Sequence, residues 1–294
     1  MKRNILHKIG AALLLVLIGS TPALAANDLP GPHGSISLGA EYASGRYGTD
    51  ATVRSVYLPL IVTWLPTNRF DLSLEIPYLF QSSDQVTTDL YRNGQGTVTR
   101  VPVGRGGYGR NRSAAQPSQP EAEIAASSAA SGSDVSGLGD LILRLGFIAL
   151  PEGAHTPQLR PSLFVKIPTA RAEDGLGTGE FDGGLGLGAS KWVGNLQLAG
   201  EGFYNYQGKA EGFGLRNYVS WTAQAGYLLT ENLEPFLVVK GATAPAASSG
   251  NLLEGRVRIL WSFAAATVLD LYLARGLTDS SPDYGAGLAV CYSF

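Results

Sequence analysis

Charged side chains at every second position are the residues of this chain best suited to chemistry. Arg69, Asp71 and Glu75 alternate with large apolar residues, and Arg256 and Arg258 do the same further along the chain. Alternate residues of a β-strand point to the same face of the sheet. These charges therefore line one polar face, where acids and bases can either hold the polar groups of a solute or neutralise one another.

By the same parity we expect a mixed set of charges on the inner face of a closed sheet, nine acids and seven bases. The set is Glu41, Arg69, Asp71, Glu75, Asp140, Arg144, Arg160, Lys166, Asp182, Glu201, Glu234, Lys240, Glu254, Arg256, Arg258 and Asp270. Four aromatic residues share this face: Phe164, Phe203, Phe236 and Tyr272. A general anion or cation pore would carry charges of one sign. Two interpretations remain: the charges pair across strands and fill the interior, or some of them line a constriction together with the aromatic rings.

Signals for catalysis, metal binding or cofactor binding are weak. Two histidines, His33 and His155, remain after the leader described below, and both lie outside the predicted strands. The single cysteine, Cys291, excludes an internal disulfide. The glycines of residues 175–188 are not followed by a helical pattern, as a dinucleotide-binding loop would require. We therefore expect no enzyme activity, no metal and no cofactor.

The first 25 residues have the pattern of an export signal. Lys2, Arg3 and Lys8 precede an apolar run, and Ala23-Leu24-Ala25 forms a small-x-small cleavage site. Removing these three bases from 22 Lys+Arg and 24 Asp+Glu leaves a net charge of 19 − 24 = −5. This acidity argues against nucleic-acid binding, which needs a basic face. We predict a signal peptide over 1–25 and one domain over 26–294.

Period-two alternation is the dominant pattern of the rest of the chain, and it predicts about twelve strands. They lie near 34–43, 54–65, 68–80, 138–150, 156–168, 180–192, 194–206, 216–229, 232–243, 251–263, 264–273 and 283–294. Short turns alternate with longer loops at 44–53, 81–137, 169–179, 207–215, 244–250 and 274–282. This alternation of loop lengths is typical of a bacterial outer-membrane barrel.

Strand alternation by itself also fits a periplasmic β-sandwich with its apolar faces turned inward. Four features favour a barrel that spans the outer membrane: the export signal, the loop lengths, the strand lengths and the aromatic residues near strand ends. The aromatic residues are Trp64, Tyr78, Trp192, Tyr206, Tyr227 and Trp261. Only a closed sheet pairs all its backbone groups in lipid. The predicted fold class is therefore all-β, a transmembrane antiparallel β-barrel with short periplasmic turns and long extracellular loops.

Several short motifs resemble a known family. Phe294, behind alternating apolar residues, resembles the C-terminal assembly signal of outer-membrane barrels. Residues 136–147 and 175–192, each a Gly-rich run followed by a strand pattern, resemble the outer-membrane transporter family labelled meta-pathway of phenol degradation. The resemblance implies a channel for small aromatic or hydrophobic compounds and recognition of Phe294 by the barrel assembly machinery. The long insertion before Ser136 departs from the family pattern.

Residues 81–137 form the largest predicted loop, with five arginines in its first half and low complexity from Ser113 to Ser133. Three roles remain open for it: contact with lipopolysaccharide phosphates, an inward fold that constricts the lumen, or a solvated loop with neither role. Barrels of about 8 strands are filled by side chains and those of about 16 to 18 hold open channels, so we expect a narrow path through about twelve. The predicted function is a passive channel for small solutes; the alternative is a non-transporting structural or adhesion barrel with an ion-paired interior.

Overall fold

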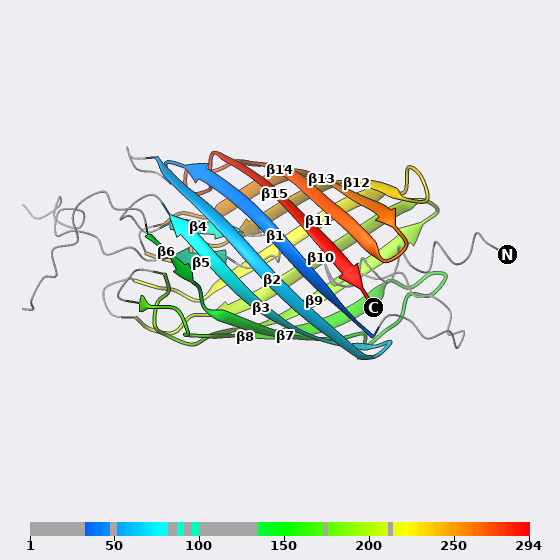
Figure 1. Ribbon diagram of the computed structural model, residues 1–294, viewed down its shortest axis with the longest axis horizontal. Helices are drawn as coiled ribbons and strands as arrows, with labels where there is room; N and C mark the ends of the chain where they lie inside the picture. The colour runs from blue at the N-terminus through cyan, green and yellow to red at the C-terminus, as the bar shows by residue number, and fades with distance from the viewer. Residues whose placement is uncertain are drawn as a thin grey trace, which may run out of the picture.

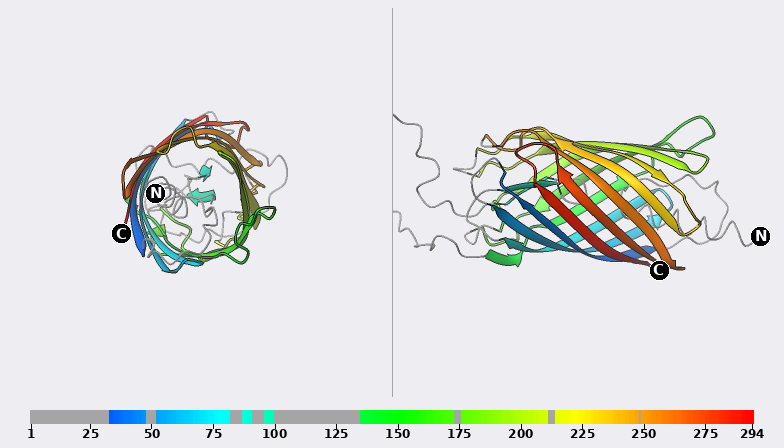
Figure 2. Two further views of the ribbon diagram at one scale, coloured as in Figure 1. Left: turned by 90° about the vertical axis from the view of Figure 1, so that its right-hand side faces the viewer. Right: turned by 90° about the horizontal axis from the view of Figure 1, so that it is seen from above.

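The computed structural model describes residues 33–47, 52–81, 87–90, 96–99, 135–172, 176–210, 214–247 and 249–294. They form a closed antiparallel barrel, seen from the side in Figure 1 and end-on in Figure 2. The strands are β1 (Gly34–Gly45), β2 (Val53–Thr67), β3 (Phe70–Gln81), β4 (Thr87–Leu90), β5 (Gly96–Thr99), β6 (Val135–Leu138), β7 (Leu141–Phe147), β8 (Gln158–Ile167), β9 (Asp182–Val193), β10 (Leu196–Tyr206), β11 (Tyr218–Tyr227), β12 (Leu233–Ala242), β13 (Leu252–Ala264), β14 (Thr267–Gly276) and β15 (Tyr284–Ser293). The predicted signal peptide, residues 1–25, lies outside the described residues.

Each strand of the wall pairs with its neighbour in sequence, and β1 pairs with β15 to close the ring. Because β6 and β7 occupy one position beside β3, the wall has 12 strands, as predicted. The backbone of Phe294 extends the closure. Its carbonyl accepts hydrogen bonds from the N–H groups of His33 and Gly34 at 2.7 and 3.1 Å, and its N–H donates to the Gly34 carbonyl at 3.0 Å. No sheet edge is left open at this seam, as a membrane-spanning sheet requires.

A bulge between β6 and β7 interrupts the strand predicted over 138–150. Tyr78 pairs with Leu138 and Glu75 with Ile142, so two residues of β3 face three residues of the interrupted strand. One of the two is Pro77, which has no N–H to give to the ladder. The Thr169 hydroxyl takes over part of the pairing: it accepts from the Leu141 N–H at 3.0 Å and donates to the Gly139 carbonyl at 3.3 Å. The bulge thereby anchors the loop between β8 and β9.

The two faces of the wall differ as the parity predicts. Outward-pointing Leu, Val, Ile and aromatic side chains are exposed on nearly every strand, whereas inward-pointing side chains are mostly buried. Trp64, Tyr206, Tyr227 and Trp261 are among the exposed aromatic residues near strand ends. Trp192 also lies near a strand end but faces inward: it is the register partner of inward-facing Gln197, and its indole Nε1 is buried. No helix among the described residues is long and apolar enough to cross a membrane.

The long connection between β3 and β6 contains a hairpin, β4–β5, that the sequence did not reveal. Viewed end-on, this hairpin lies inside the ring of strands, and viewed from the side it lies within the wall at the end opposite the C-terminus (Figures 1 and 2). We call that end the loop end, and the end where β1 begins and β15 finishes the turn end. The inward fold of the loop is therefore seen for residues 87–90 and 96–99. The low-complexity part, residues 113–133, lies outside the described residues.

Candidate functional site: the barrel interior

Arg160 forms the centre of an ion-pair cluster on one side of the interior. Its Nη2 lies 2.5 Å from Oδ1 of Asp71, and its Nε lies 3.1 Å from Oδ2, a bidentate geometry. Its Nη1 lies 3.9 Å from Oε1 of Glu201, which also accepts a hydrogen bond from the Ser162 hydroxyl at 3.3 Å. Arg160 comes from β8 and Asp71 from β3, so the guanidinium must pass over β7. Gly146 of β7 leaves the space, because a Cβ there would lie 1.8 Å from Nη2 of Arg160.

Glu75 forms a second cluster next to the first, towards the loop end. It accepts a charge-assisted hydrogen bond from Nη2 of Arg144 at 2.7 Å and another hydrogen bond from the Tyr57 hydroxyl. The Arg144 guanidinium also lies 6.0 Å from the centre of the Phe164 ring, at the edge of cation–π range. An acid, a base and two aromatic rings are thus held together in the interior.

The opposite side of the interior carries a third cluster on β13, β14 and β1. Arg258 binds Asp270 in a bidentate manner, with Nε–Oδ1 at 2.9 Å and Nη2–Oδ2 at 2.7 Å. Arg256 is paired with Glu254 and stacks over the Tyr272 ring at 4.3 Å. Removing one partner of such a buried pair costs much stability, because the other charge stays buried without compensation.

The other inward acids and bases of this side lie close by. The Tyr272 hydroxyl donates to Glu41 on β1. Lys240 is buried and is the register partner of Glu254, and Glu234 is buried near the start of β12. One carboxylate oxygen of Glu234, Oε1, has no hydrogen-bond partner among the described residues.

Inward aromatic rings lie over glycines of the neighbouring strand. Phe164 is the register partner of Gly184, Phe236 of Gly226, and Tyr272 of Gly287. Phe203 likewise lies opposite Gly186, and its ring meets that of Phe164 at a centroid distance of 6.0 Å in an edge arrangement. A Cβ on any of these four glycines would lie between 2.1 and 2.5 Å from the ring. The glycine-rich strands therefore make room for rings inside a narrow barrel.

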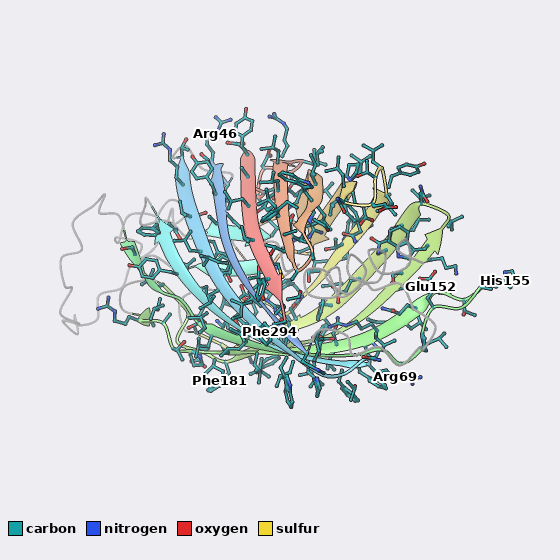
Figure 3. All side chains as sticks on the ribbon, turned by 45° about the vertical axis from the view of Figure 1, so that its right-hand side comes forward. Arg46, Arg69, Glu152, His155, Phe181 and Phe294 are labelled. Atoms are coloured by element: carbon teal, nitrogen blue, oxygen red, sulfur yellow. The ribbon has the colours of Figure 1, made fainter. Side chains whose placement is uncertain are left out.

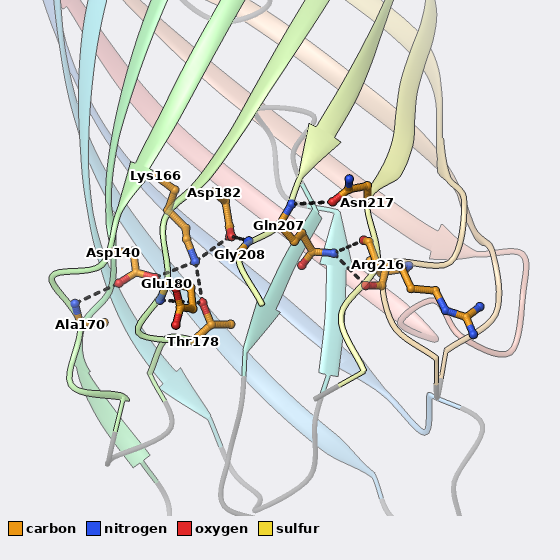
Figure 4. A network of polar contacts seen from close by, with 11 residues as sticks. Asp140, Lys166, Ala170, Thr178, Glu180, Asp182, Gln207, Gly208, Arg216 and Asn217 are labelled. Atoms are coloured by element: carbon orange, nitrogen blue, oxygen red, sulfur yellow. Dashed lines mark hydrogen bonds and ion pairs between the residues drawn. The ribbon is translucent and has the colours of Figure 1, made fainter. Parts of the chain in front are cut away.

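Lys166 forms a polar cluster at the loop end (Figure 4). Its Nζ lies 3.0 Å from Asp140, 2.7 Å from Asp182 and 3.1 Å from the Thr178 hydroxyl. Asp140 also accepts from the backbone N–H of Ala170 at 3.0 Å. The bulge after β6, the end of β8, the start of β9 and the loop between β8 and β9 are all tied together at this point.

Leu176 points into the interior from the loop between β8 and β9. It is 4% exposed and packs against Tyr57 and Leu79, which face inward from β2 and β3. Gly137 accommodates it, because a Cβ there would lie 2.5 Å from Cδ1 of Leu176. This loop therefore folds inward, which the sequence analysis did not predict; a lone apolar residue in a Gly-rich loop was the only available signal.

Of the charged and aromatic residues placed inside by parity, all but one lie on the inner face. They are Glu41, Asp71, Glu75, Asp140, Arg144, Arg160, Phe164, Lys166, Asp182, Glu201, Phe203, Glu234, Phe236, Lys240, Glu254, Arg256, Arg258, Asp270 and Tyr272. Arg69 differs: it lies in the turn between β2 and β3 and is exposed at the turn end (Figure 3). The predicted strand 68–80 begins two residues later in the structure, so parity no longer applies to Arg69. His33 and His155 are also exposed, and no metal-binding cluster occurs among the described residues.

Four buried amides also line the interior, although the candidate residues were restricted to charges and aromatic rings. Gln158, Gln197 and Gln224 are buried on the inner face near the turn end, and Asn205 is buried near the loop end. Small cavities lie beside some of them. One cavity near Arg160 and Gln224 measures about 20 Å³, and another beneath Leu176 measures about 40 Å³. Many inward side chains of the described residues are thus paired, and small cavities lie between some of them.

The fold resembles solved outer-membrane barrels. The COG4313 outer membrane channel from Pseudomonas putida F1 superposes with a TM-score of 0.61 at 15% identity, over 92% of this chain and 100% of that one. The KdgM porin superposes with a TM-score of 0.50 at 9% identity, over 88% of this chain and 99% of that one. At these identities the likeness concerns the fold.

The sequence itself matches a family model over residues 97–294, about two thirds of the chain. A comparison with curated proteins gave no significant match. The closed barrel with its apolar outer face and the family match together place the protein in the bacterial outer membrane. The chain belongs to the family described as "Putative MetA-pathway of phenol degradation".

Proposed function

We propose that this barrel is a passive channel for small hydrophobic or aromatic compounds across the outer membrane. One observation carries the proposal: four inward aromatic rings, each lying over a glycine, share the inner face with paired acids and bases. Ring faces offer apolar and stacking contact to an aromatic solute. Charges of both signs line the path, nine acids and six bases without Arg69, so no ring of a single sign selects for anions or cations.

The proposed path passes between the cluster centred on Arg160 and the cluster on β13 and β14. Ion pairs of the two clusters border this region, so we expect a solute to pass more easily when some pairs rearrange. The β4–β5 hairpin inside the ring narrows the same path at the loop end (Figure 2). Such a channel admits small compounds and excludes large polar ones. The turn end faces the periplasm, because short turns lie on that side of outer-membrane barrels.

Solute flux into vesicles that hold the purified protein tests this function. We expect small aromatic compounds to enter faster than in protein-free vesicles, and the double variant Asp71→Ala, Arg160→Ala to increase the rate by removing a central pair. A double variant of the half-buried pair at the turn end, Lys191→Ala and Glu152→Ala, is the control and leaves the rate unchanged. Absence of flux for every small aromatic tried, from a barrel that is intact by circular dichroism, would overturn the proposal.

A non-transporting structural or adhesion barrel is the second candidate. Asp71 with Arg160 and Asp270 with Arg258 form buried, mutually neutralising pairs. Such pairs favour this candidate, because filling the interior would be enough to explain them. This candidate predicts no flux in the wild type and a large loss of stability when the inward charges are neutralised. Flux through the double variant alone would support it.

The proposed partners follow from the location. Outer-membrane lipid surrounds the apolar wall, Phe294 is the proposed contact for the barrel assembly machinery, and lipopolysaccharide phosphates are the proposed contact of the arginines of the long loop. We propose no enzyme activity and no cofactor, because both remaining histidines are exposed at the turn end, away from the inward carboxylates.

A further inference from the structure

The cavity beneath Leu176 has an apolar wall and a polar rim. Tyr57, Leu79, Ile142 and Phe164 line it from the barrel wall, and Leu176 closes it from the loop side. Asp140, Lys166 and Asp182 lie at its rim, already bound to one another. A few well-placed polar groups in a mostly apolar hollow are typical of small-molecule sites.

Asn205 lines this cavity and carries an unused hydrogen-bond acceptor. The residue is 1% exposed, and its Nδ2 lies 3.4 Å from the Phe203 carbonyl, 3.3 Å from the Tyr218 carbonyl and 2.9 Å from the Ser220 hydroxyl. Carbonyl oxygens only accept, so these contacts fix which side of the amide carries the N–H groups. Oδ1 therefore points the other way, and it is buried with no hydrogen-bond partner among the described residues.

A buried acceptor without a partner costs about 1–3 kcal/mol, so it favours any ligand that brings a donor. The cavity of about 40 Å³ holds a few water molecules but is too small for an aromatic ring, which needs about 150 Å³. The Leu176 side chain fills the adjoining space. The loop that carries it is joined to the wall through Thr169, Ala170 and Thr178, all by polar contacts.

We propose that this cavity is a binding site for small apolar compounds that carry one hydroxyl group, an inference that rests on the proposed channel function. The hydroxyl donates to Oδ1 of Asn205, and the apolar body takes the place of the Leu176 side chain between Tyr57, Leu79 and Phe164. Leu176 thus covers the site when it is empty and moves aside when a compound binds.

Calorimetric titration of the detergent-solubilised full chain tests this site, with empty micelles as the blank. The probes are benzyl alcohol and benzyl methyl ether, which share the ring but differ in the O–H donor. We expect the wild type to bind the alcohol about fivefold more tightly than the ether, the usual worth of one hydrogen bond. Leu176→Ala enlarges the cavity, so it should bind both probes more tightly and keep the preference.

Asn205→Leu should bind both probes equally, because it keeps the side-chain size and removes the acceptor. Gln224→Leu is the matched control: it removes another buried inward amide, from the other cavity, and should retain the preference. If Asn205→Leu does not fold, Asn205→Ala takes its place; alanine also lacks an acceptor, so the same equal binding of the two probes is expected. Equal binding of alcohol and ether by folded Leu176→Ala would overturn the site. Because vesicle flux is measured separately, loss of the site and loss of the channel function are distinguishable.

Discussion

The Phe236 ring on β12 lies over Gly226, its register partner on β11, with 2.3 Å between the ring and the place where a Cβ would stand. The same ring lies 5.6 Å from the Arg258 guanidinium, which binds Asp270. One small residue on β11 therefore lets a ring lie flat against the wall, and the ring in turn supports a buried ion pair. Gly226 therefore contributes to the packing of the barrel interior although it has no side chain.

Gly226→Ala should destabilise the barrel, because the added methyl group collides with a ring that is packed on both sides. We expect a loss of about 1–3 kcal/mol, the usual cost of overpacking, measured by urea unfolding from lipid vesicles. Gly200→Ala is the control, since the nearest atom to its Cβ is 3.6 Å away. Adding Phe236→Leu to Gly226→Ala should recover most of the lost stability, because the smaller side chain leaves room for the methyl group. Equal effects of Gly226→Ala and Gly200→Ala would contradict the pairing.

The Asp71–Arg160 pair allows a test of whether the interior charges stabilise the fold. Asp71→Asn leaves the Arg160 guanidinium buried with only the more distant Glu201, so we expect a loss of about 3 kcal/mol. Asp71→Asn with Arg160→Gln removes both charges and should cost less than the single change. Unfolding in urea measures both. A double variant less stable than Asp71→Asn would show that the charges stabilise the barrel by something other than mutual neutralisation.

Lys191→Gln is the comparison for that experiment. Lys191 binds Glu152 at 3.1 Å at the turn end, and its side chain is about a quarter exposed. Exposed pairs contribute about 0–1 kcal/mol, and breaking a buried pair costs about 3–5 kcal/mol. Because this pair is half-buried, we expect a loss between these limits and below that for Asp71→Asn.

The sequence predicted the number of strands, the parity of the wall and the sorting of charge by face, because a side-chain period of two is a local property. It did not predict which charges meet. Arg160 reaches Asp71 across β7 only because Gly146 is there, and this depends on three strands in register. The inward turn of Leu176 was also missed, since nothing in a Gly-rich loop fixes its direction. Arg69 was misplaced because parity fails where a strand gives way to a turn.

The β4–β5 hairpin inside the ring should limit conductance. Replacing residues 86–100 with a short Gly-Ser linker is expected to raise single-channel current in planar bilayers, because it removes backbone from the path (Figures 1 and 2). Deleting Val103 to Ser133 leaves both hairpin strands in place and is the control, for which we expect little change. A larger current from the deletion than from the linker would assign the constriction to the low-complexity segment instead.

Phe294 is expected to matter more for assembly than for the stability of the finished barrel. Its backbone makes three hydrogen bonds with His33 and Gly34, which any residue at this position can make. Its ring is 56% exposed and is stacked on Tyr292 at a centroid distance of 6.5 Å. Phe294→Ala should therefore cost no more than about 1 kcal/mol in urea unfolding of refolded protein, while the amount of folded protein in outer membranes of cells falls several-fold. Tyr292→Ala removes the other ring of the stack without changing the terminal residue and serves as the control. Equal membrane levels of Phe294→Ala and wild type would exclude recognition of this ring by the assembly machinery.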